Sequence, residues 1–151
     1  MGMYTRLTFW AEIPEGSPAV PALLGLQASR ADAENAGSIP DHEFFQKDHA
    51  WAILNCSSYY HQTGETFFRH DRTANCWFLN IDSSLKNYAG EILSFLDWLS
   101  PYDVNGAMAF RGFYQHEEDE HPTLIYRVDG AYRFKDVGKY QSTLEWIANA
   151  G

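Results

Sequence analysis

The sequence has few cysteines, few basic residues and no long apolar run, and each shortage argues against a class of protein. Cys56 and Cys76 are its only cysteines among 151 residues, whereas small secreted domains are held together by several disulfides. We therefore expect both thiols to be reduced, and the residues after Met1 lack the apolar core of a secretion signal. No apolar stretch approaches the ~20 residues that cross a bilayer. These absences predict a cytoplasmic protein that has no membrane partner.

Basic residues number 11 against 20 acidic ones, which gives a formal net charge of −9. Direct binding of nucleic acid needs a dense basic face that displaces counterions, so this composition argues against it. A strongly acidic surface instead attracts cations or a basic protein. The charge therefore favours a basic protein as the partner, although a high net charge also serves solubility alone.

Signatures of catalysis, metal binding and phosphate binding are lacking as well. The six histidines form no H-x-x-x-H or H-x-H pair, and no Cys-x-x-Cys is present, which argues against a zinc site. The run 116–121 is acidic but lacks the spacing of a calcium loop. There is no G-x-S-x-G elbow and no glycine-rich phosphate turn. We predict no metal site, no cofactor and no catalytic residue, and we consider an enzyme the less favoured class.

What is present is a series of short strands interleaved with a few helices. Apolar alternation and turn residues predict strands over 4–11, 66–71, 76–83, 107–114, 123–128 and 131–134. A strand or short helix is expected at 51–56, and Phe44 and Phe45 are expected to anchor the chain before it. The dipeptide Asp129-Gly130 is a strong signal for a two-residue hairpin turn.

The clearest helix signal is the recurrence of Ile92, Phe95, Leu96 and Leu99 at i, i+3, i+4 and i+7, with Asn87 as the cap. Further helices are predicted after Ser17 and over 140–149, whereas 31–40 is predicted to be a flexible loop. The sum is an α+β fold with a largely antiparallel sheet and two or three helices packed on one face, in a single domain spanning residues 1–151.

Aromatic residues make up 16% of the chain, and several tyrosines are interleaved with acids. Rings supply contact area in protein interfaces, and carboxylates pair with lysine and arginine of a partner. This pattern points to a non-enzymatic domain that inhibits or neutralises a basic protein, of the immunity, antitoxin or anti-defence type. The candidate protein-binding residues are Glu117, Glu118, Asp119, Glu120, Tyr114, Tyr126, Tyr59 and Tyr60.

A different class remains open, namely a small enzyme or ligand-binding domain with a pocket on the open face of the sheet. Its first polar groups would be His61, His70 and Arg111, together with Tyr114. Such a site requires a concave surface with converging polar groups, whereas an inhibitor requires an exposed patch of aromatic and acidic side chains.

Three segments stand out, namely MYTRLTF at 3–9, SSLKNYAGEI running on to FLDWLSPY over 83–102, and EEDEHPTLIY at 117–126. Together they resemble a family of small uncharacterised bacterial proteins of similar length. The resemblance covers most of the chain. It implies one intact domain and no particular chemistry.

Overall fold

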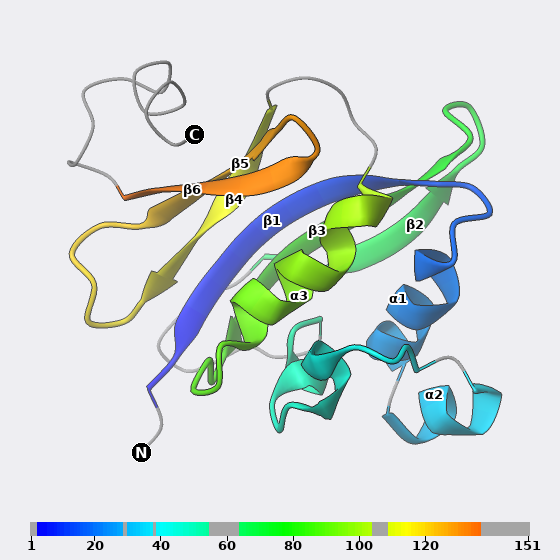
Figure 1. The fold of residues 1–151 in the computed structure, drawn as a ribbon, viewed down its shortest axis with the longest axis horizontal. Coiled ribbons are helices and arrows are strands. Elements are labelled where there is room, and N and C mark those ends of the chain that lie inside the picture. The colour runs from blue at the N-terminus through cyan, green and yellow to red at the C-terminus, as the bar shows by residue number, and fades with distance from the viewer. Residues whose placement is uncertain (1–2, 29, 38, 55–63, 104–108, 137–151) are drawn as a thin grey trace.

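The computed structural model of the chain describes residues 3–28, 30–37, 39–54, 64–103 and 109–136. Six of its strands form one antiparallel sheet in the order β2-β3-β1-β4-β5-β6, with helices on one side (Figure 1). The predicted α+β class is therefore confirmed. The elements are β1 (Thr5–Pro14), α1 (Ala19–Ala28), α2 (Arg30–Ala36), β2 (Phe67–Asp71), β3 (Cys76–Leu85), α3 (Glu91–Leu99), β4 (Ala109–His116), β5 (Thr123–Val128) and β6 (Ala131–Asp136), with 3₁₀ turns at Glu43–Gln46, Ala50–Ala52 and Ser100–Tyr102.

Strand β1 lies in the middle of the sheet and contributes one face to the core. Leu7, Phe9 and Ile13 are buried and alternate with half-buried residues, because successive side chains of a strand point to opposite faces. Ile81 of β3 lies opposite Phe9 and is also buried. The strand runs on to Pro14, three residues further than the alternation predicted, because β3 continues to pair with it.

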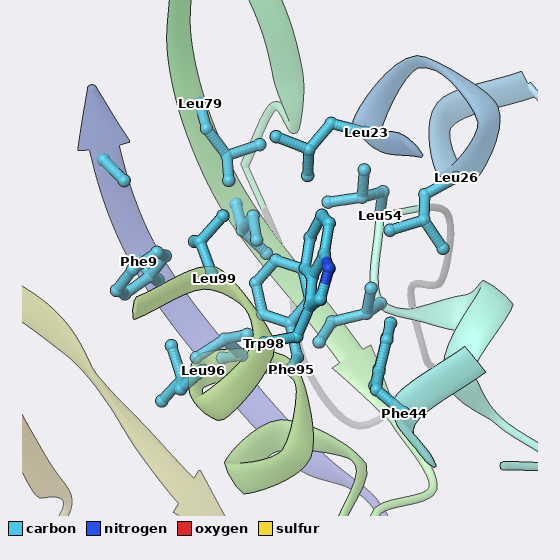
Figure 2. Packing of buried hydrophobic residues seen from close by; sticks show 14 of the residues in the cluster. Phe9, Leu23, Leu26, Phe44, Leu54, Leu79, Phe95, Leu96, Trp98 and Leu99 are labelled. Carbon is cyan, nitrogen blue, oxygen red and sulfur yellow. The ribbon is translucent and has the colours of Figure 1, made fainter. Parts of the chain in front are cut away.

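Helix α3 packs its apolar stripe against this face of the sheet. Ile92, Phe95, Leu96 and Leu99 are all buried, as their spacing predicted. Figure 2 shows the side chains of Phe95 and Trp98 within the same cluster as Leu23, Leu26 and Phe44. Strands β1 and β3, helices α1 and α3 and the 3₁₀ turns therefore share one core.

The start of α3 differs from the prediction. Asn87 does satisfy a helix N–H, because its Oδ1 accepts a hydrogen bond from Ile92 N at 2.8 Å. However, the helix begins at Glu91, and Gly90 with φ 72° occupies the capping position. The side chain of Asn87 therefore reaches the second helical residue across a left-handed glycine rather than capping a helix that begins directly after it.

The prediction of a flexible loop over 31–40 was wrong, because Arg30–Ala36 is helix α2. Alanine has the highest helix propensity, and Ala33 is buried at 2% exposure. Arg30 and Glu34 also form an i, i+4 ion pair at 3.0 Å. Small residues are frequent in loops, but here they let the short helix α2 pack against α1.

Both hairpins that the turn residues predicted are present in the structure. Strands β2 and β3 are joined through 72–75, and β5 and β6 through Asp129 and Gly130, both at positive φ. The segment 51–56 was predicted as a strand or short helix and begins with a 3₁₀ turn, while its last residues and the helix predicted over 140–149 lie outside the described residues. Among the described helices, none combines the length and hydropathy that crossing a membrane requires.

Candidate functional site

The acidic turn, residues Glu117–Glu120, connects β4 to β5 and is closed by one backbone and one side-chain hydrogen bond. Asp119 N donates to His116 O at 2.9 Å, and His116 N donates to the Asp119 carboxylate at 3.3 Å. Glu117 N donates to Tyr4 O at 3.0 Å, which ties the turn to the chain leading into β1. The turn therefore holds its side chains on a defined backbone.

The four acids of the turn do not play equal parts. Glu118, Asp119 and Glu120 are exposed, and the Glu120 side chain reaches 90% exposure. Glu117 is half-buried, and its Oε2 is buried without a hydrogen-bond partner in the described part of the chain. The carboxylates of Glu118 and Glu120 are consequently available to a partner. Asp119 is exposed but also accepts a hydrogen bond within the turn, and Glu117 belongs mainly to the turn itself.

Beside the turn lies a hollow of about 250 Å³, named here the acidic hollow. It is lined by Asp119, Glu120, His121, Thr123 and Asp136. Asp136 enters it from the end of β6, because it pairs with Thr123 at the start of β5. None of these lining residues is lysine or arginine, so the hollow presents carboxylates from two separate elements.

Of the four tyrosines predicted as protein-binding residues, Tyr114 and Tyr126 are described, and only Tyr114 lies near the hollow. Tyr114 pairs with Thr123 across β4 and β5 and is half-buried. Burial raises the pKa of its phenol, and a hydrogen bond with Thr123 acts in the opposite direction. Tyr126 is three residues along β5 from Thr123 and hence points to the other face, where its ring meets Phe110 at 5.4 Å. Tyr59 and Tyr60 lie outside the described residues.

Arg111, a predicted pocket residue, belongs to a buried ion pair. Its side chain is 0% exposed, and its Nε and Nη2 donate to the two oxygens of Asp103 at 2.9 and 3.1 Å. Asp103 also accepts a hydrogen bond from Tyr132 Oη at 2.8 Å, and burial followed by the charge of Asp103 raises the pKa of that phenol. The guanidinium lies 4.5 Å from the ring centre of Trp10. This network fastens β4 and β6 to the chain that follows α3 and the 3₁₀ turn Ser100–Tyr102.

The two histidines predicted to share a pocket with Arg111 are not placed beside it by the described part of the structure. His70 lies on β2, with Nε2 3.6 Å from Glu15 Oε1 and its ring 5.2 Å from that of Trp77. Strands β3 and β1 separate β2 from β4 in the sheet, and His61 lies outside the described residues. Within the described ranges, no group of three or more His, Cys, Asp or Glu side chains is placed to hold a metal ion.

A feature that sequence reasoning missed is a groove between α3 and β6, with a volume of about 280 Å³. Its lining includes Leu93, Leu96, Asp97, Ser100, Tyr132 and Phe134. Leu93 is 48% exposed and falls outside the buried stripe of α3. That apolar residue on the polar side of a clear helix was the one signal that could have indicated the groove.

No protein-family model, curated protein or solved structure matches the chain. The resemblance to small bacterial proteins therefore stays a prediction.

Proposed function

We propose that this chain is a non-enzymatic protein-binding domain that inhibits or neutralises a basic protein. The observation that carries the proposal is the acidic hollow, where the exposed turn between β4 and β5 meets Asp136 of β6. Carboxylates from two elements face a common space whose lining includes no lysine or arginine. A lysine or arginine of a partner entering this space would meet several acceptors at once.

The net charge of the chain supports the same proposal. A charge of −9 speeds the approach of a basic partner and disfavours acidic ones. Exposed ion pairs each contribute only about 0–1 kcal/mol, so the acidic turn supplies steering and orientation rather than most of the affinity. The partner must also bury apolar surface to bind tightly.

The alternative, a ligand pocket on the sheet face, has less support. Of its described polar groups, His70 lies on β2, whereas Arg111 and Tyr114 lie on β4, which is not a neighbour of β2 in the sheet. Arg111 is fully buried and directs its Nε and Nη2 to Asp103 in the interior. A catalytic or ligand site needs converging polar groups within reach of a substrate.

Capture from a lysate of the source cells tests the proposal. We expect the wild-type chain to retain one basic protein at ~0.1 M salt and to lose it near ~1 M, because the Debye length falls from about 10 Å to about 3 Å. The variant Glu118→Lys/Glu120→Lys should retain much less of that protein, since it replaces two carboxylates that attract a basic partner with two positive charges that repel it.

The matched control is Glu34→Lys/Asp41→Lys, which changes the net charge by the same amount at two exposed positions. Helix α2, which contains Glu34, lies at the right of Figure 1, far from the connection between β4 and β5 at the left. If both variants lose the captured protein equally, only the net charge matters, and the acidic turn is not the binding site.

A further inference from the structure

We propose that the basic partner adds an antiparallel strand to the outer edge of β6, with apolar side chains in the groove beside α3 and a basic side chain at the acidic hollow. The inference rests on the proposed function and specifies how the partner is held. It joins two features that lie along one strand, the groove and the hollow.

Strand β6 is an edge of the sheet. It pairs with β5 from Ala131 opposite Val128 to Asp136 opposite Thr123, and no further strand follows it in the sheet formed by the described residues. An edge strand presents backbone N–H and C=O groups that an extended segment of another protein can complete. Main-chain hydrogen bonds then provide affinity, and the flanking pockets provide specificity.

The helix side of β6 provides an apolar pocket next to this edge. Tyr132 and Phe134 are two residues apart and therefore share a face, and both line the groove with Leu93 of α3. The end of the groove near the hairpin is fixed, because Ser100 Oγ donates to Gly130 O at 3.3 Å and Arg127 Nη1 donates to Ser100 O at 2.9 Å. An apolar side chain of a partner would thus find a preformed, partly exposed apolar surface.

The same face of β6 becomes acidic at its end. Asp136 follows Phe134 by two residues, which is about 6.8 Å along a strand, and Asp136 lines the acidic hollow. Arg133 and Lys135 alternate with Tyr132, Phe134 and Asp136 along the strand and therefore point to the opposite face of the sheet. Along β6, the face toward the helices is therefore apolar at first and acidic at its end, whereas the opposite face carries two basic side chains.

This pattern defines the sequence of the partner strand. In antiparallel pairing, the partner residue opposite Asp136 comes first and those opposite Phe134 and Tyr132 follow at two-residue intervals. The helix-side positions should read basic, apolar, apolar, and the two positions between them, beside Lys135 and Arg133, should be acidic or polar. We expect a five-residue motif that reads lysine or arginine, then an acidic or polar residue, then an apolar residue, then a second acidic or polar residue, then a second apolar residue.

A displayed library of random heptapeptides, panned against the full chain, tests this motif. Wild type should enrich the five-residue pattern by at least about tenfold over unselected peptides. Leu93→Asp alters an exposed position of α3 and should remove the apolar preference while keeping the basic one. Glu120→Lys/Asp136→Lys should remove the basic preference while keeping the apolar one. Circular dichroism of each variant checks that the fold is intact.

The outcomes separate the two proposals. A basic preference in wild type without the spaced apolar residues, or an apolar preference that survives Leu93→Asp, would overturn strand addition and leave the proposed function standing. Absence of any basic preference would count against the proposed function itself. Two further results would overturn the inference. If the wild-type chain is a dimer in sedimentation velocity and Leu93→Asp dissociates it, a second copy of this chain occupies the groove. If peptides are enriched only after residues 137–151 are deleted, those residues occupy it.

Discussion

Gly112→Ala is expected to lower the free energy of unfolding by roughly 3 kcal/mol or more. Gly112 has φ 141°, and a Cβ there would overlap the carbonyl oxygen of Thr8 and press on the backbone of Phe9. Because both contacts are to the main chain of β1, they cannot be relieved by a side-chain rotation. The sheet would have to separate β1 from β4 where these strands pair.

The matched control for this change is Gly130→Ala. Gly130 also has a positive φ, 81°, but a Cβ there would meet nothing within 4 Å. Its cost should be confined to the left-handed backbone, about 1–2 kcal/mol. Urea unfolding followed by circular dichroism measures both values, and equal costs would contradict the close approach of β4 to β1.

Asp103→Ala is expected to cost about 3–5 kcal/mol of unfolding free energy, because it leaves the buried guanidinium of Arg111 without its carboxylate. The two residues are joined by two hydrogen bonds, and both side chains are fully buried. Tyr132 loses its acceptor in the same variant. Replacing one member of a buried pair leaves a desolvated charge, which is far more costly than removing both.

The double variant Asp103→Leu/Arg111→Met distinguishes this reason from a simple loss of packing. It removes both charges and keeps apolar volume, so it should be more stable than Asp103→Ala alone. Tyr132→Phe should cost about 1.5–3 kcal/mol, the range for a hydrogen bond to a charged group. A cost below about 1 kcal/mol for Asp103→Ala, measured in the same urea series, would contradict the structural role given to the pair.

Much of the fold was predictable from local patterns. The stripe of Ile92, Phe95, Leu96 and Leu99, and the dipeptide at 129–130, both lie within a few residues of the element that they define. The acidic turn was predictable for the same reason, since four charges in succession between two apolar alternations have to lie in a connection. These elements needed no knowledge of the tertiary fold.

The features that were missed depend on partners distant in the fold. Tyr114 and Tyr126 looked equivalent in the sequence, and only the register of β4 with β5, which shifts between Phe110 and Gly112, places them on opposite faces. Arg111 carries no sequence signal of burial, because Asp103 reaches it from the chain that follows α3. The groove likewise arises from α3 and β6, which sequence reading does not bring together.

The most direct test of the central claim is the dissociation constant of the captured basic protein, measured by isothermal titration calorimetry with wild type and with Glu118→Lys/Glu120→Lys. Removing two exposed pairs and introducing repulsion should weaken binding by about tenfold or more at low salt, with a smaller difference at high salt. The control Glu34→Lys/Asp41→Lys should bind within about twofold of wild type. A dissociation constant unchanged by the turn variant would contradict the account.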